Sequence, residues 1–303
     1  TDWHIDQMTW AVNRSAPLKL SIPHEMYLYG TNEYVYVYDT KDQPMLLSDV
    51  VKVFKHPEIK IALSSGKKVD YIIARKLVIP VNKENALKSG IVPAMYADRI
   101  PDSITLEIPA GKSYLTKPEL FMLDLLSSYE WDRPINMLSQ GGDLDIGLKE
   151  YLMCDGFSSR LVPFKNKIGT TQPGLVDPDF LYHQMTEVFS WDALKRDDYF
   201  VDYQNYYTFM GVLSQRQLYL NVANALIDIE EDEKALEILD LCQANVPAEN
   251  YPLESICLGF SGNDYMVIQM VEDYYFLGAT EKARALGLSL ADGLLASTRF
   301  YLE

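Results

Sequence analysis

The strongest constraint on the fold lies near the C-terminus, where one helical pattern occurs twice. The segments "DEKALEIL" and "TEKARALG" align at Ala235 and Ala283, and a long helical segment precedes each of them. Helix pairs of this kind have one apolar face each and bury it by stacking on one another. The pattern therefore predicts an all-helical region with two hairpins, at about 213–247 and 262–296.

The spacing within the first copy resembles the tetratricopeptide repeat, a helix–turn–helix unit. The residues that carry the resemblance are Tyr219, Val222, Ala223 and Leu226, where that family has bulky, bulky, small and bulky side chains, and Pro247 closes the unit. The second copy matches less well, so an irregular helical bundle remains the alternative. The resemblance implies a groove lined by the first helix of each hairpin, which would bind a peptide without any catalytic residue. The expected groove residues are Gln217, Leu220, Asn224, Ile227, Tyr265, Ile268, Glu272 and Tyr275.

The part of the chain before these hairpins has mixed α/β patterns. "EYVYVYD" alternates between tyrosine and valine, which predicts a strand inside a sheet. Helices are expected for "NKENALKSG", capped by Asn82, and for "KPELFMLDLLSSY", with Pro118 in its first turn. We also expect "GLKEYLMCDG" to be a helix that ends at its second glycine. The predicted fold is thus mixed (α+β), with an α/β domain over residues 1–168 followed by an all-helical domain over residues 169–303.

Composition excludes several classes of partner. The chain has 303 residues, 43 of them acidic and 27 basic, for a net charge of −16. Such a charge disfavours nucleic acids and anionic lipid surfaces, because both are bound through clusters of Lys and Arg. A run of about 18 apolar residues, the minimum for a membrane helix, does not occur. The three cysteines are too scattered for a zinc site, and the sequence leaves open whether Cys242 and Cys257 pair.

The sequence contains two groups of potential metal ligands, and neither supports a metal site or a cofactor. Asp2, His4 and Asp6 would converge only on a strand, whereas their segment has a helical pattern. Asp143 and Asp145 form the Asp-x-Asp pair that holds a metal–nucleotide-sugar in many glycosyltransferases, but a pair at this spacing is expected by chance in a chain so rich in aspartate. A solvated turn is the better interpretation.

Tyrosine is unusually abundant, with 21 residues concentrated near 27–38, 199–207 and 265–275. Tyrosine rings pack cores, and on a surface they can also stack on sugars or hold extended peptides. The first role is the more common one. The sequence alone does not separate the two roles.

Several longer segments resemble one bacterial family of multi-pass membrane proteins, the family of domain of unknown function 2723. They include "SIPHEMYLYGTNEYVYV", "KLVIPVNKENALKSGIVP", "LDLLSSYEWDRPINML" and "GLKEYLMCDGFSSRLVPFK", in this order. The membrane part of that family is similar to O-mannosyltransferases that use lipid-linked sugars. The resemblance implies a periplasmic region that follows the last membrane helix, with Thr1 as a processed or artificial boundary. It also places the acceptor-activating carboxylate in the membrane part, so no catalytic residue is expected here.

Three hypotheses follow from these observations. The favoured one is an accessory domain that binds or orients protein acceptors of a membrane-embedded glycosyltransferase, in contact with its own membrane portion. The others are a structural or oligomerising module and an independent soluble glycosyltransferase that uses Asp143 and Asp145. In addition, Asp102-Ser103-Ile104 fits a short acceptor sequence for O-glycosylation, which makes Ser103 a candidate modification site.

Overall fold

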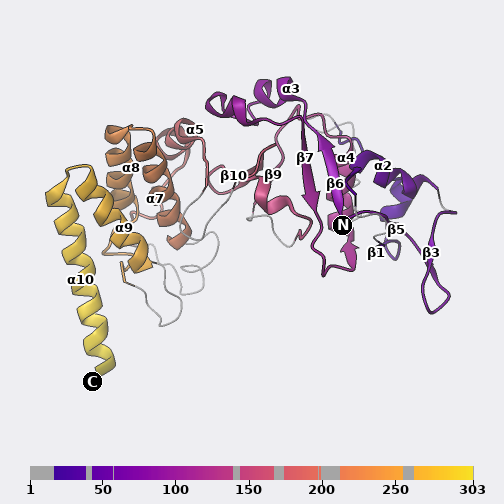
Figure 1. The fold of residues 1–303 in the computed structure, drawn as a ribbon. Helices are drawn as coiled ribbons and strands as arrows, with labels where there is room; N and C mark the ends of the chain where they lie inside the picture. The colour runs from indigo at the N-terminus through magenta and orange to yellow at the C-terminus, as the bar shows by residue number, and fades with distance from the viewer. Residues whose placement is uncertain are drawn as a thin grey trace. The chain divides into compact units, whose positions relative to one another are not determined.

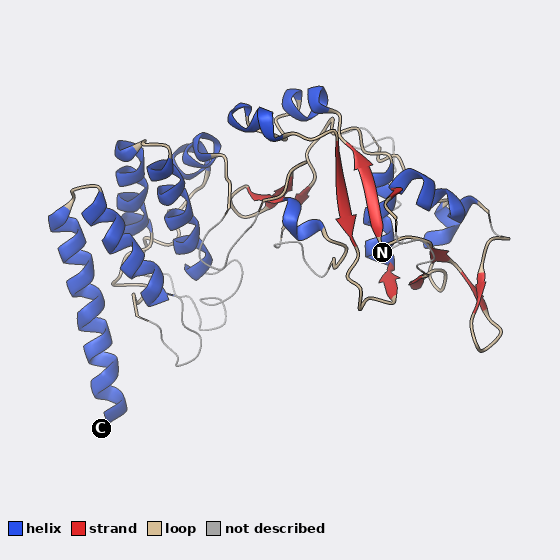
Figure 2. Cartoon of the chain, in the orientation of Figure 1, coloured by secondary structure: helices blue, strands red, loops and turns tan. Residues whose placement is uncertain are grey.

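The structure is a computed structural model, drawn as a ribbon in Figure 1. In it the chain divides into two compact units. The first unit contains residues 1–153 and 159–167, and the second contains residues 154–158 and 168–303. The described residues are 17–38, 43–56, 58–138, 144–166, 174–196, 198, 212–254 and 263–302. The first unit holds several small sheets and the second is helical, so the predicted fold class is confirmed (Figure 2). The expected boundary between 168 and 169 lies outside the described residues.

The first unit is built from short strands and short helices. Its strands are β1 (Tyr34–Val37), β2 (Met45–Leu46), β3 (Ile61–Ala62), β4 (Lys68–Val69), β5 (Tyr71–Ile72), β6 (Lys76–Pro80), β7 (Ser103–Glu107), β8 (Tyr114–Thr116), β9 (Asn136–Met137), β10 (Leu152–Cys154, whose last residue belongs to the second unit) and β11 (Ser159–Leu161). Its helices are η1 (His24–Tyr27), α2 (Leu47–Lys52), η2 (Val53–Lys55), α3 (Lys83–Lys88), η3 (Ala94–Arg99), α4 (Lys117–Ser127) and η4 (Leu148–Tyr151).

The "EYVYVYD" strand is the centre of a mixed sheet with the order β5-β1-β8. β1 pairs parallel with β5 and antiparallel with β8. Val35 and Leu115 lie opposite each other and are completely buried on the face of the sheet next to α4. The tyrosines alternate with them and lie on the other face.

A second mixed sheet has the order β2-β6-β7, and its alternate side chains are buried in the core of the same unit. β6 and β7 are antiparallel, and Leu77 faces Leu106 while Ile79 faces Ile104, all of them buried. Pro80 is the last residue of β6, where its missing N–H costs the ladder no hydrogen bond. The remaining strands form the sheet β10-β11-β9 and the hairpin β3-β4.

The helix signals of the first unit are confirmed at two positions. The side chain of Asn82 accepts a hydrogen bond from the backbone N–H of Asn85 and so caps α3. α4 has Pro118 in its first turn, as expected, and Thr116 and Glu119 add a reciprocal capping box.

The expected helix over "GLKEYLMCDG" is wrong. Only Leu148–Tyr151 is helical, and the chain then enters strand β10. Gly147 has a φ of 83°, and a Cβ there would lie 2.7 Å from the backbone nitrogen of Glu107. Because the backbone passes so close to β7, this segment follows the sheet rather than its own helical periodicity.

The second unit contains the helices α5 (Pro178–His183), η5 (Gln184–Val188), α7 (Val212–Asp228), α8 (Asp232–Asn245), α9 (Asn263–Phe276) and α10 (Thr280–Leu302). α7 packs on α8 and α9 packs on α10, and α9 also contacts α7 and α8, so two helix pairs are stacked. The side chains expected to face inward are buried, including Tyr219, Ala223 and Ala235 in the first pair and Ala283 in the second. Among the described helices, none has the length and apolar character needed to cross a membrane.

Candidate functional site on the stacked helix pairs

A buried arginine fixes the start of α9 relative to α7. Arg216 of α7 donates hydrogen bonds from Nη1 to the side chain of Asn263 (3.0 Å) and to the carbonyl of Pro252 (2.8 Å). Its Nη2 donates to the carbonyl of Tyr251 (2.6 Å). Asn263 in turn donates to the carbonyls of Pro252 and Leu253, both at 2.8 Å. These bonds hold residues 251–253 against α7 and the first residue of α9, and so fix the orientation of α9.

The expected groove residues of α7 do not form an open surface. The assignment of Leu220 to a groove is wrong, because its side chain is completely buried in the core of the helical unit. Gln217 is half-buried and donates a hydrogen bond to Asn221 (2.8 Å). Asn224 and Ile227 are half-buried as well. Of the four expected residues of α7, three are thus partly accessible and none is fully exposed.

The expected residues of α9 are all exposed. The side chains of Tyr265, Ile268 and Tyr275 are 67%, 44% and 50% exposed, and Glu272 lies between them. Their spacing of three, four and three residues puts them on one face of the helix. Phe276, 72% exposed, extends this face. We call these five residues the α9 face.

The sequence reasoning missed Phe276 because it used only the repeat positions. A signal was available, since Phe276 follows Tyr275 in the same tyrosine-rich cluster and the helix ends directly after it. It also missed Arg216 and Asn263, which are 47 residues apart and have no local pattern that links them.

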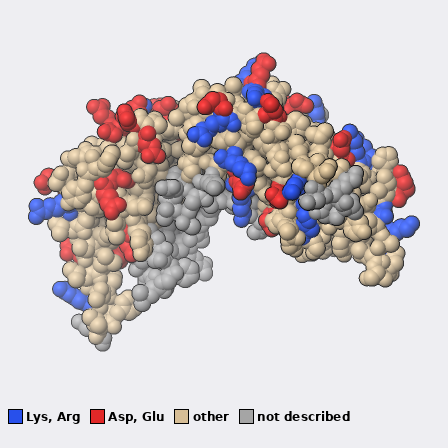
Figure 3. All heavy atoms as spheres, viewed as in Figure 1, with Lys and Arg blue, Asp and Glu red and all other residues tan. Residues whose placement is uncertain are grey.

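The net charge of the chain is concentrated on the second unit. This unit contains 23 of the 43 acidic residues but 7 of the 27 basic ones, which accounts for the whole charge of −16. In the view of Figure 3 the Asp and Glu side chains gather over the helices, with few Lys or Arg among them. An aromatic surface on so acidic a unit favours partners that carry positive charge.

One carboxylate within α9 has a raised pKa. The Oδ2 atom of Asp273 is buried and has no hydrogen-bond partner among the described residues. Burial, with a further contribution from the charge of Glu272, raises the pKa of Asp273 to about 6. α9 therefore carries a group that titrates close to neutral pH.

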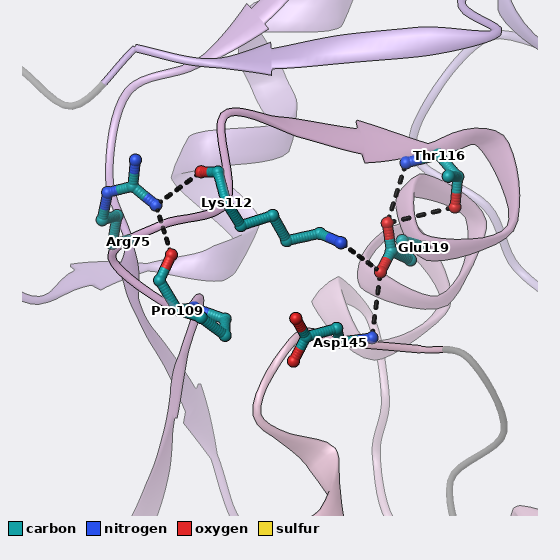
Figure 4. A network of polar contacts seen from close by, with 6 residues as sticks. All are labelled: Arg75, Pro109, Lys112, Thr116, Glu119 and Asp145. Atoms are coloured by element: carbon teal, nitrogen blue, oxygen red, sulfur yellow. Dashed lines mark hydrogen bonds and ion pairs between the residues drawn. The ribbon is translucent and has the colours of Figure 1, made fainter.

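The Asp-x-Asp pair of the third hypothesis is partly outside the described residues, which begin again at Leu144. Asp145 is described, and its carboxylate is exposed. Its backbone N–H donates to Glu119 Oε1 (2.9 Å), and Figure 4 shows the Asp145 side chain extending away from Glu119. The contact that fixes this residue is therefore made by its backbone.

Glu119 itself is a structural residue. It is 1% exposed, and its Oε1 also receives Lys112 Nζ (3.0 Å). Its Oε2 accepts from the backbone N–H and the hydroxyl of Thr116, at 2.8 and 3.0 Å. Four donors occupy the four lone-pair positions of the carboxylate, so it has none left for a substrate. The loop between β7 and β8, which carries Lys112, is held by Arg75. Its Nη1 donates to the carbonyls of Pro109 and Lys112, both at 2.8 Å (Figure 4).

Other predicted site residues are scattered. Asp2, His4, Asp6 and Cys257 lie outside the described residues. Among the residues that are described, no group of three or more His, Cys, Asp or Glu side chains could hold a metal ion. Cys242 is buried, which raises the pKa of its thiol to about 12 and keeps it protonated.

Ser103, the candidate modification site, is accessible. It is exposed at the start of β7, an edge strand of its sheet, opposite Pro80. Its neighbour Asp102 is exposed and forms an ion pair with Lys83 (2.9 Å), while Ile104 on the other side is buried. The hydroxyl can therefore be reached by an enzyme without unfolding of the strand.

Comparison with known proteins gives one match. The model of the family TMEM260-associated domain 2 matches residues 1–180, which is more than half of the chain. No curated protein and no solved structure matches the chain. The match contains the sheets of the first unit and ends within α5, before the helix pairs α7–α8 and α9–α10.

Proposed function

Because the chain belongs to the TMEM260-associated domain 2 family, we propose that it is a non-catalytic accessory domain of a membrane-embedded glycosyltransferase-like protein. In this proposal it binds protein acceptors and presents them to a reaction centre on the membrane portion. The resemblance to the family of domain of unknown function 2723 supports such a parent protein and a periplasmic location. The stacked helix pairs support a tetratricopeptide-like mode of peptide binding.

The α9 face is the observation that carries this function. It combines three exposed aromatic rings with Ile268 and Glu272, on a unit with a charge of −16. Aromatic side chains supply contact area at a low entropic cost, and acidic surroundings attract basic segments. We therefore propose that the acceptor segment is extended and carries aromatic or aliphatic anchors next to Lys or Arg.

A glycosylation assay with the full-length protein tests this function. The double variant Tyr265→Ser/Tyr275→Ser and the charge reversal Glu272→Lys should each reduce the rate of acceptor glycosylation by about tenfold or more, since loss of an interface anchor costs more than about 1 kcal/mol and 1.4 kcal/mol corresponds to tenfold. Tyr29→Ser, which removes a 92% exposed tyrosine from the first unit, is the matched control and should leave the rate unchanged. Equal rates in all four proteins would rule out the α9 face as the acceptor site.

The C-terminal half of α10 favours a second function, assembly with another surface. Its buried residues, Ala283, Leu286 and Leu290, all lie in the first half of the helix. The second half exposes Leu294, Leu295, Phe300, Tyr301 and Leu302. Replacement of Phe300 and Leu302 by Ser should abolish self-association in sedimentation experiments if this half-helix joins two copies, and unchanged sedimentation would reject that role.

A further inference from the structure

The outer face of the sheet β5-β1-β8 carries five tyrosines. Tyr36 of β1 lies opposite Tyr71 of β5 on one side and Tyr114 of β8 on the other. Residues in register point to the same face, so these three form a row across the sheet. Tyr34 and Tyr38, two residues before and after Tyr36, share this face. We call these five residues the tyrosine face.

The tyrosine face is accessible and its rings are held in place. Tyr34, Tyr38 and Tyr114 are 60%, 53% and 45% exposed, and Tyr36 and Tyr71 are half-buried. The rings of Tyr34 and Tyr114 meet edge to face at 4.9 Å, and those of Tyr38 and Tyr71 at 6.0 Å. Such pairs restrict ring rotation, so a ligand would find a surface that is largely formed in advance.

A polar hollow adjoins this face. It has a volume of about 360 Å³ and is lined by Tyr34 and Tyr36 together with the charged side chains of Glu33, Lys67, Lys68 and Asp70. Lys67 and Lys68 are exposed donors. Glu33 and Asp70 are acceptors with one oxygen each already paired, to Lys117 and to Lys60, both at 2.9 Å. Donors and acceptors of both signs in one hollow suit a ligand with many hydroxyl groups.

Charge argues for a neutral ligand. The first unit has 20 acidic and 20 basic residues, so it has no net charge with which to select a charged polymer. This differs from the second unit, which accounts for the whole net charge of −16. The two units therefore present aromatic surfaces of different electrostatic character.

We propose that the tyrosine face binds a neutral hexose oligosaccharide. The apolar C–H faces of the sugar rings would lie on the tyrosines, and hydroxyl groups would bond to the side chains of the hollow. Neighbouring strands are about 4.8 Å apart, so the row of three tyrosines spans about 10 Å, enough for two consecutive sugar units. The site lies within the region matched by the family model and does not depend on acceptor binding at the α9 face.

A membrane surface is the competing partner, since tyrosines also anchor proteins at lipid interfaces. The tyrosine face is less suited to that role. The two carboxylates of the adjoining hollow balance its two lysines, so the hollow has no excess of positive charge with which to bind an anionic surface.

The test uses the complete chain with cellotriose and an α-linked mannotriose as probes. Saturation-transfer NMR should show contact with at least one of the two, and calorimetry should give its affinity. Tyr34→Ser and Tyr114→Leu should each weaken binding about tenfold, as expected for loss of one aromatic anchor. Tyr265→Ser on the α9 face is the matched control and should bind like the unchanged chain. Circular dichroism confirms that the variants are folded.

Three results would overturn the proposal. The first is the absence of contact with both sugars, and the second is binding that Tyr34→Ser and Tyr114→Leu leave unchanged. The third is co-sedimentation of the chain with phosphatidylcholine–phosphatidylglycerol vesicles that the same two variants abolish, which would assign the face to a lipid surface. The α9-face variants test acceptor binding by the second unit, whereas Tyr34→Ser and Tyr114→Leu test sugar binding by the first. Failure of one proposal is therefore distinguishable from failure of the other.

Discussion

Replacement of Arg216 by Met tests how the second unit holds α9 in position. The substitution keeps most of the aliphatic volume but removes the guanidinium, which donates to the carbonyls of Tyr251 and Pro252 and to Asn263. Pro252 keeps one donor, because Asn263 also bonds to its carbonyl. The carbonyl of Tyr251 and the side-chain oxygen of Asn263 each lose the hydrogen bond from Arg216.

The magnitude follows from the burial of these groups. Arg216, Tyr251 and Asn263 are each no more than 2% exposed, so water cannot replace the lost donors without opening the core. A buried hydrogen bond from a charged donor contributes about 1.5–3 kcal/mol, and loss of two such bonds gives about 3–5 kcal/mol of lost stability. Arg216→Lys should lose less, because a single ammonium group can still reach part of the cluster.

Hydrogen exchange measured by mass spectrometry is the appropriate assay, because it reports each segment separately. In Arg216→Met, peptides that contain residues 251–253 or the first turn of α9 should exchange about 100-fold faster or more, as 3 kcal/mol implies. Peptides from the first unit should be unchanged. Arg196→Met is the matched control, since Arg196 forms an exposed ion pair with Asp198 that adds little stability. Unchanged exchange around α9 in Arg216→Met would refute the reasoning.

Three further predictions concern the carboxylates of Asp273 and Glu119 and the hydroxyl of Ser103. The pKa of Asp273 is raised to about 6 in the folded chain, so its contribution to stability is complete below its ordinary pKa of 3.8 and is lost as pH rises through 6. Asp273→Asn should therefore raise the free energy of unfolding by about 1–2 kcal/mol at pH 7 and leave it unchanged at pH 3.5. Urea unfolding at both pH values measures this, and the same difference at both would contradict it. Glu119→Gln should cost about 2–4 kcal/mol, seen as faster exchange of residues 109–119, because an amide cannot accept from all four donors; normal protection there would refute the role of Glu119. Native protein should have an intact mass above that of its sequence, and Ser103→Ala should remove the difference if Ser103 is glycosylated, whereas an unshifted native mass would exclude the modification.

Local signals in the sequence were sufficient for elements whose stability is local. The cap by Asn82, the proline in the first turn of α4 and the alternation in β1 each concern residues within one turn or one strand. The same holds for the buried positions Ala235 and Ala283, since their environment follows from helical periodicity.

Features that depend on distant contacts were not predictable from such signals. The helical pattern after Gly147 was overridden by the close approach of β7. The tyrosine face requires β5 and β8 to pair with β1, and the alternation of a single strand does not specify its neighbours. Likewise, Asp124 binds the backbone of Ser21 and Ile22 and the hydroxyl of Tyr27, about a hundred residues away along the chain.

Photo-crosslinking in cells that express the full-length protein tests the central claim most directly. A photoreactive amino acid replaces Tyr265 on the α9 face, and the same replacement at Tyr29 serves as the control position. The proposed function predicts crosslinks from position 265, but not from position 29, to proteins that carry a glycan and lose it in the Tyr265→Ser/Tyr275→Ser variant. Crosslinks from position 265 that lead only to a second copy of the chain, or only to proteins whose glycosylation is unaffected by that variant, would contradict it.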